Sequence, residues 1–498
     1  MVSTAVDPSQ VASAVGIATA FKQLRENGTA ILPQRVAVIG QGASASTYSN
    51  TKAQYFSAFA VGEAYGFGSP VHLAAKQLLP SNGDGLGTVP MTIYPLDDDV
   101  SGVAAAGDIT PSGAATGSAT FVVKISEIKS ARFNVTSGDT VSDIIDAMAA
   151  AVAANVDMPM IGTDNTTVFD LAAKWQGSSA NDLVIEVEAI GTDSSGVTFA
   201  ITQPTGGANN PDITTALDQI GNVWETCLVS CFEHSDTTIL DAFNAYNEGE
   251  WAALIHQPCY VLYGNTPQSV SNGIATTNVR PLDRTNYIVP SPKSKELPLA
   301  IAARAASRIA VSANNNPAKG YRRLPLTGLV PGADAEQWST TQRDAAVKGG
   351  SGTTEVRDNV MVLSDVTGMF KPTGDPTPAW RYLVTTVKRQ QVLYNLTLIF
   401  DSLEWASAPL LPAGQATTNP TAKSPTAAIA EISQLIDNLA LQAILSNPEA
   451  AKATIASAID GVNSNRLNAS LTDQVSGNVE IISIDSNFGF FNDIANLV

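Results

Sequence analysis

Cysteine and histidine are both scarce in this chain of 498 residues, with three of each. Three cysteines do not make a disulfide framework, so we expect free thiols in a reducing compartment. Three histidines leave few positions for chemistry that depends on an imidazole. Basic residues are also few, because 28 lysines and arginines stand against 46 acidic residues, a net charge of −18. This imbalance argues against nucleic acid or an anionic membrane surface as the main partner.

Long apolar runs are missing as well. The best candidate, 297–311, is interrupted by Arg304 and Arg308, so no transmembrane helix is expected. The first ten residues carry neither a basic cluster nor an apolar run, so we expect no secretory signal. Hydrophobic residues nevertheless make up 44% of the chain, which is enough for folded domains. The length predicts about three of them.

Strands and helices alternate in two separated parts of the chain, 31–100 and 212–330. Residues 35–39 (RVAVI) form a β-branched run that predicts a buried strand. In the second part, a helix that begins at Ser235 or Asp236 lies between strands predicted at 222–232, 259–263 and 286–289. Strand–helix–strand units of this spacing favour parallel strands. Together the two parts predict one split α/β domain.

The intervening segment, 101–211, differs in composition and pattern. Its first residues, 101–119, are rich in Ala, Gly, Ser and Thr. One helix with an apolar stripe is predicted to begin after Asp139 or Thr140. Strands are predicted at 119–125, 131–135, 182–189 and 196–202. Because Pro and Gly bound this segment, we predict an α+β domain inserted into the split domain.

The rest of the chain predicts an α+β C-terminal domain over 331–477, flanked by an arm. Its elements are a strand at 360–363 and helices over 380–400, 426–445 and 448–459. The alternating run 478–484 predicts a strand in a C-terminal arm, 478–498. At the other end, residues 1–30 have too little apolar content to form a domain alone. We therefore predict an N-terminal arm there.

A glycine-containing turn at 36–45 (VAVIGQGASA) is the most suggestive local motif. It follows a strand, as a dinucleotide-binding turn does, and Glu63 lies about 20 residues further on. However, 44–51 is polar and does not begin an amphipathic helix, and Glu63 falls within a helical pattern. An ordinary strand-to-loop turn is favoured. A dinucleotide-binding enzyme that uses this turn is the alternative.

Five residues provide enough ligands for a zinc site: Cys227, Cys231, His234, His256 and Cys259. Yet Cys227 lies inside a predicted apolar strand, where cysteine behaves as a small hydrophobic residue. No serine lies in a Gly-x-Ser-x-Gly elbow that would favour a hydrolytic triad. We therefore predict no catalytic residues, no metal, no cofactor and no enzymatic activity.

Basic residues gather between Arg280 and Arg323, where nine of them are opposed only by Asp283 and Glu296. Arg304 and Arg308 are four apart and are expected on one helix face. Two interpretations stay open: a solvated surface, or a positive patch that docks acidic surface on another copy of the chain. From this pattern and the terminal strand, the predicted inter-subunit residues are Arg280, Arg284, Arg304, Arg308, Arg322, Arg323, Val479 and Ile481.

Four stretches, taken in order, carry a resemblance to a known family. They are 28–42 (GTAILPQRVAVIGQG), 322–328 (RRLPLTG), 360–368 (VMVLSDVTG) and 380–400 (WRYLVTTVKRQQVLYNLTLIF). With them the chain resembles the contractile-tail sheath proteins of bacteriophages, specifically the Mu-like sheath family. The resemblance covers nearly the whole chain and is weakest in 101–211 and after about residue 412.

The resemblance implies an architecture: a subtilisin-like α/β core that is not a protease, an outward-facing inserted α+β domain, an α+β C-terminal domain facing the tail tube, and extended terminal arms. It also implies stacked six-fold rings of identical subunits, held in a stretched state until contraction drives the tube through the host envelope. The expected partners are further copies of the chain and the tube, baseplate and tail-terminator proteins, without nucleic acid or membrane. The expected location is the virion tail, after assembly in the host cytoplasm. A non-contractile self-assembling shell or appendage protein is a further alternative.

Overall fold

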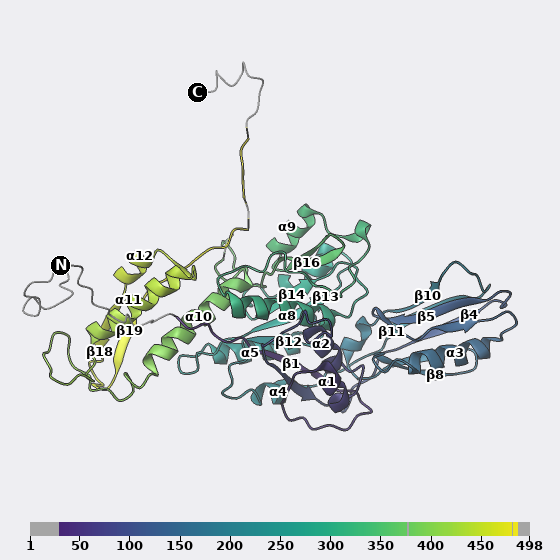
Figure 1. Ribbon diagram of the computed structural model, residues 1–498, viewed down its shortest axis with the longest axis horizontal. Coiled ribbons are helices and arrows are strands. Elements are labelled where there is room, and N and C mark those ends of the chain that lie inside the picture. The colour runs from purple at the N-terminus through teal and green to yellow at the C-terminus, as the bar shows by residue number, and fades with distance from the viewer. Residues whose placement is uncertain (1–28, 376–377, 481, 487–498) are drawn as a thin grey trace, which may run out of the picture.

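The computed structural model describes residues 29–375, 378–480 and 482–486. Figure 1 shows an elongated molecule in which three parts follow one another: a β-rich part at one end, a central α/β part, and a smaller helical part at the other end. The described residues near the C-terminus project away from the body. Within the described ranges, no helix combines the length and the apolar character needed to cross a bilayer.

A six-stranded sheet forms the centre of the molecule. Its order is β14 (Asn286–Pro290), β13 (Tyr260–Asn265), β12 (Cys227–Ser230), β1 (Val36–Gln41), β3 (Met91–Leu96) and β2 (Ala53–Tyr55). Neighbouring strands run parallel except β2, which is antiparallel to β3 at the edge. The five parallel strands are buried along their whole length. Burial on both faces explains why their sequences read as continuous apolar runs rather than alternating ones.

Helices cover both faces of this sheet. Val36 and Val38 of β1 join one hydrophobic cluster, with α1 (Ala58–Tyr65), α2 (Pro70–Leu78) and α8 (Pro298–Asn315). Ala37 and Ile39 join the opposite cluster, with α4 (Thr214–Asp218) and α5 (Thr237–Glu250). Two short helices, α6 (Val270–Gly273) and α7 (Ala275–Asn278), follow β13. The predicted parallel α/β arrangement of strands is thus present in the structure.

The β-rich part lies between β3 and α4 and contains two antiparallel sheets. One holds β5 (Ala119–Ile125), β6 (Ile128–Lys129), β7 (Phe133–Val135) and β10 (Ile185–Ile190); the other holds β4 (Ala106–Ser112), β8 (Met160–Asp164), β9 (Phe169–Ala173) and β11 (Thr198–Thr205). Helix α3 (Val141–Ala153) packs with them, and a short 3₁₀ turn, η2, covers Ser178–Asp182. Thr140 begins α3 through a capping box with Asp143, which decides between the two predicted caps.

Residues after α8 first return to the central part. They form η3 (Asp334–Glu336), α9 (Thr340–Lys348) and the hairpin β15 (Thr353–Arg357)–β16 (Val360–Asp365). Met361, Leu363 and Val366 belong to the same hydrophobic cluster as β1. The division predicted at residue 331 therefore does not coincide with a change of hydrophobic cluster, which occurs further along, inside α10 (Leu383–Phe400).

The smaller helical part follows α10 and has its own hydrophobic cluster. Its elements are α11 (Pro425–Leu441), β17 (Leu445–Ser446), α12 (Pro448–Ala453), β18 (Ala456–Ile459), β19 (Leu467–Ser470) and β20 (Gln474–Val475). The helix predicted over 448–459 is wrong in its second half, because the chain turns at Thr454 and pairs as β18 with β19. The strand predicted at 478–484 is also not formed in 478–480 and 482–484, because no other strand pairs with it within the described chain.

Candidate interaction surfaces

Arg304 and Arg308 lie one turn apart on α8, and both reach Asp84 in the loop after α2. The Arg304 side chain is 1% exposed, and its Nη2 lies 2.9 Å from Asp84 Oδ2. The Thr327 hydroxyl donates to the same oxygen at 2.5 Å, and Arg308 pairs with the other oxygen of Asp84. The predicted shared face is present, but Arg304 is buried and Arg308 is only 20% exposed. The placement of Arg304 on an exposed docking surface is therefore wrong.

The other predicted arginines also have partners within the chain. Arg280 bonds Asp241 at 2.7 Å and Asp283 at 3.0 Å. The guanidinium of Arg284 lies 5.8 Å from the ring centre of Trp251 and 5.9 Å from that of Trp380, which is cation–π stacking. These contacts divide the predicted positive patch, because Arg280 is paired with carboxylates and Arg284 is stacked on two tryptophan rings of the same chain.

Arg322 and Arg323 lie beside the exit of the C-terminal segment. Arg322 lies 3.5 Å from Asp365 and donates to the backbone oxygen of Glu480 at 2.5 Å. Arg323 is exposed and has a positive φ of 65°, and its backbone N–H bonds Leu363. Of all the arginines in the predicted set, Arg323 alone keeps an exposed guanidinium with no ion pair or ring contact among the described residues.

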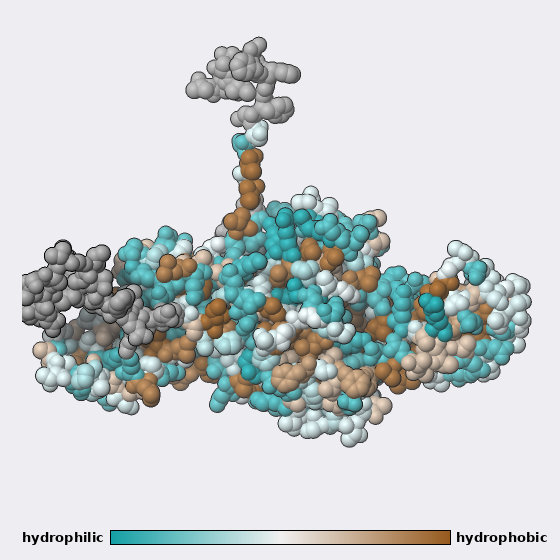
Figure 2. All heavy atoms as spheres, in the orientation of Figure 1, coloured by the Kyte–Doolittle hydropathy of each residue, from teal (hydrophilic) through white to brown (hydrophobic). Residues whose placement is uncertain are grey.

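The segment after Asn478 exposes apolar side chains. Val479, Ile482 and Ile484 are 75%, 74% and 82% exposed. Figure 2 shows this apolar colour along the segment that projects from the body. Ile481 lies outside the described residues, as do 1–28 of the predicted N-terminal arm and 487–498 of the C-terminal one. An inter-subunit role for Val479 and Ile481 remains a prediction.

The glycines of the 36–45 turn are required by close packing. A Cβ at Gly40 would lie 2.5 Å from Cys231 Cβ, and one at Gly42 would lie 2.3 Å from the Tyr48 ring. The next helix, α1, begins only at Ala58, so no helix N-terminus points at the turn. A dinucleotide turn needs such a helix to hold the phosphates. The favoured interpretation, a strand that ends in a loop, fits this geometry.

The three cysteines are free and buried. Burial raises the pKa of Cys227 to about 12 and also raises those of Cys231 and Cys259, so all three are thiols at neutral pH. In the part of the chain that the structure describes, no three His, Cys, Asp or Glu residues gather as a metal-binding group. These cysteines act as small apolar residues of the sheet.

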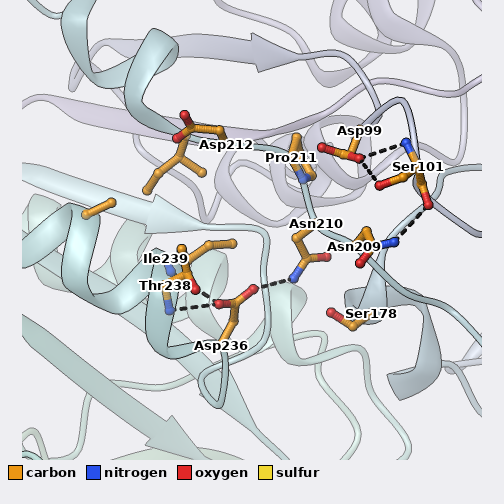
Figure 3. A pocket seen from close by; sticks show the side chains of 12 residues that line it. Asp99, Ser101, Ser178, Asn209, Asn210, Pro211, Asp212, Asp236, Thr238 and Ile239 are labelled. Atoms are coloured by element: carbon orange, nitrogen blue, oxygen red, sulfur yellow. Dashed lines mark hydrogen bonds between the residues drawn. The ribbon is translucent and has the colours of Figure 1, made fainter.

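A polar pocket of about 440 Å³ lies where the chain leaves and re-enters the central part. Figure 3 shows Asn210 pointing at Asp236, whose carboxylate accepts its amide at 2.9 Å and also caps α5. In the loop after β3, Asp99 accepts from the backbone and hydroxyl of Ser101, and Asn209 donates to the Ser101 carbonyl at 2.8 Å. The Asn209 bond thus joins the segment that leaves the central part to the segment that re-enters it, and the Asn210 bond joins the re-entering segment to the start of α5. We did not predict the pocket; its only signal was the Asn-Asn-Pro run at 209–211.

Comparison with known proteins gives one curated relative. No protein-family model matches the sequence. The chain is similar to the tail sheath protein of the Mu-like prophage FluMu of Haemophilus influenzae, with 24% identity over 270 residues. The match covers 53% of this chain and 54% of the relative, so the chain spans about half the length of the curated relative it matches. The resemblance to Mu-like sheath proteins predicted from the sequence is confirmed.

Two crystal structures are also similar to the chain. A sheath tail protein from Desulfitobacterium hafniense has a TM-score of 0.45 at 13% identity, covering 92% of this chain and 100% of that one. A sheath tail protein from Listeria innocua has a TM-score of 0.47 at 11% identity, covering 91% of this chain and 94% of that one.

Proposed function

We propose that this chain is a structural subunit of a contractile tail sheath. Copies of it polymerise as stacked rings around a tail tube, and their rearrangement shortens the array and drives the tube through the host envelope. The observation that carries the proposal is the 270-residue similarity to the tail sheath protein of a Mu-like prophage. The location that this proposal implies is the tail of a virion, after assembly in the host cytoplasm.

The division into parts supports this function. A rigid α/β core with helices on both faces resists deformation, whereas the terminal segment with exposed Val479, Ile482 and Ile484 leaves the body. A backbone that is unpaired within its own chain can add as a strand to an exposed sheet edge of a second copy. The hairpin β18–β19 offers such an edge, since it has only two strands. Strand addition keeps copies linked while their cores rotate.

In this proposal the central part is the subtilisin-like core of the sheath family and has no enzymatic activity. The inserted part faces outward and the smaller helical part faces the tube. The six-fold rings end on baseplate and tail-terminator proteins. The energy of contraction is a difference between two sets of subunit interfaces, so the subunit needs no cofactor at the moment of work.

Truncation tests whether terminal segments link the copies. Deleting 482–498 removes the projecting segment but leaves the contacts of Lys388 and Asn478 intact. We expect a folded monomer with an unchanged melting temperature and no long tubes, by electron microscopy and sedimentation. Deleting 1–25 should give the same result.

The matched control asks whether any exposed apolar residue matters. Val100→Asp and Leu254→Asp change side chains that are 104% and 96% exposed elsewhere on the molecule. Both should assemble as the unchanged chain does, whereas Ile482→Asp with Ile484→Asp should not. Tubes of normal length from both truncations would contradict the linkage.

A further inference from the structure

Helix α10 joins the two hydrophobic clusters at either side of it. Leu383, Val384 and Val387 in its first half belong to the cluster of the central part. Val392 in its second half belongs to the cluster of the smaller helical part, with α11. Figure 1 shows α10 lying between these parts. One uninterrupted helix therefore forms a stiff connection between them.

The middle of α10 is polar, although it is buried. Four polar side chains there are between 0% and 4% exposed: Lys388, Gln390, Gln391 and Asn395. Burying such groups costs free energy unless each is hydrogen-bonded. All four bond atoms of segments that are distant in sequence. Apolar residues at these positions would be enough to fill the space. We therefore infer that the polar side chains are there to attach other segments of the chain to α10.

Two of them hold the first described residues of the chain. The Leu32 N–H donates to Gln391 Oε1 at 2.8 Å, and the Gln391 amide donates back to the Ala30 carbonyl. Asn395 accepts from the Ala30 N–H and donates to the Ala30 carbonyl, both at 3.0 Å. Because Gln391 and Asn395 are four residues apart, their side-chain amides lie on one helix face. Together they bond both N–H and C=O groups of the N-terminal backbone.

Lys388 holds the other terminal segment. Its Nζ donates to the Ser476 carbonyl at 2.7 Å, to the Ser476 hydroxyl at 3.0 Å and to Asn478 Oδ1 at 2.8 Å. Burial lowers the pKa of Lys388 to about 8, while three oxygen acceptors favour the ammonium form. Next to it, Arg389 bonds both oxygens of Asp473 at 2.7 Å. The C-terminal segment is thus fixed just before it leaves the body.

We propose that α10 carries mechanical load between the two terminal segments of the subunit, with Gln391, Asn395 and Lys388 as the positioning residues that attach those segments to it. The inference rests on the proposed function, in which these segments link neighbouring copies. Three residues of helix separate Lys388 from Gln391 and seven separate it from Asn395, which is about 5–10 Å along the axis. Because a helix is stiff over this distance, a displacement of one terminal segment is transmitted to the other and is not absorbed by the bending of loops.

Hydrogen–deuterium exchange of the unassembled subunit tests the attachments. Lys388→Met should raise exchange of amides in 474–480 by at least ~10-fold and leave 29–34 unchanged, since its three hydrogen bonds to Ser476 and Asn478 are lost. Gln391→Glu, which cannot donate to Ala30, should do the reverse. If buried charge prevents folding, Gln391→Met replaces it. Lys348→Met and Gln415→Glu make the same chemical changes at exposed positions and should alter neither segment.

Assembly of the same variants tests the load. We expect Lys388→Met and Gln391→Glu to give shorter tubes, or tubes that break on contraction, with melting temperatures near that of the unchanged chain. Unaltered exchange in both variants would contradict the attachments. Loosened segments with normal, contracting tubes would contradict the load path while leaving the proposed function intact. Absence of tubes from the unchanged chain would instead contradict the proposed function, whatever the exchange shows.

Discussion

Arg304 is a buried cation whose position depends on one carboxylate. Besides Asp84 Oδ2, its guanidinium donates to the Asp84 carbonyl at 2.6 Å and to the Thr327 hydroxyl. The Asp84 side chain is 33% exposed, so solvent partly screens its electrostatic interaction with Arg304. The arrangement joins the loop after α2 to α8 and to the segment that contains Thr327. Its value to the fold lies in leaving no buried charge unpaired.

Removing this carboxylate should therefore destabilise the protein. We expect Asp84→Ala to lower the free energy of unfolding by about 2–3 kcal/mol, less than for a fully buried pair because Arg304 keeps its neutral acceptors. Asp344→Ala is the matched control: it breaks an exposed pair with Lys348 at 2.6 Å and should cost less than about 1 kcal/mol. Denaturant unfolding measures both. Equal losses would show that Arg304 does not depend on Asp84.

The sequence predicted the geometry of Arg304 and Arg308 but not their environment. Spacing of four residues places both on one helix face, which the structure bears out. Their partner, Asp84, lies 220 residues before Arg304, and no local pattern links the two. The same holds for Gly40, since the side chain that excludes a Cβ there comes from Cys231. Long-range packing decided these cases.

At the scale of elements, the turn into α2 combines a cap with a titratable group. Ser69 caps the helix by accepting from the His72 N–H, and His72 Nδ1 accepts from the Gly68 N–H at 3.0 Å. The proton of the neutral ring is therefore on Nε2, 3.8 Å from Asp157. Burial lowers the pKa of His72 to about 4, and Asp157 only partly opposes it.

This turn should weaken in acid. Between about pH 6.5 and 4 the unfolded chain binds a proton at His72 that the folded chain does not, so stability falls as the pH falls. His72→Asn keeps an acceptor for Gly68 without titrating. We expect unfolding at pH 7.5 and 4.5 to show that the unchanged chain loses about 1–3 kcal/mol more than the variant. Parallel losses in the two proteins would contradict this role.

Helices and strands with a strong periodicity of apolar residues were predicted well, whereas strands rich in small and polar residues were not. Helices α5, α8 and α10 and strands β1, β5 and β16 lie where apolar spacing placed them. Strands β4, β8 and β9 were not predicted, because Gly, Ala, Thr and Asp interrupt their alternation. These strands form because neighbouring strands satisfy their backbone, which a single segment does not reveal. Likewise, the helix of α10 was predicted but its buried polar attachments were not, because their partners near Ala30 and Ser476 are distant in the sequence.

At the scale of the molecule, the chain is acidic and combines a central α/β body with a C-terminal segment that projects from it. The net charge of −18 must be paired or screened when many copies pack together. Most arginines of the predicted basic patch already form ion pairs with acidic residues of the same chain, so they do not neutralise the charge of neighbouring copies. Under the proposed function, we therefore expect the terminal segments to hold the copies together. Two clusters bridged by α10 would transmit their movement.

Electron microscopy of the purified, unchanged chain in negative stain tests the central claim most directly. A contractile sheath subunit should form hollow, transversely striated tubes of constant width, without any added cofactor. Monomers or small closed particles at every protein concentration and ionic strength tried, with no tubes, would contradict the account.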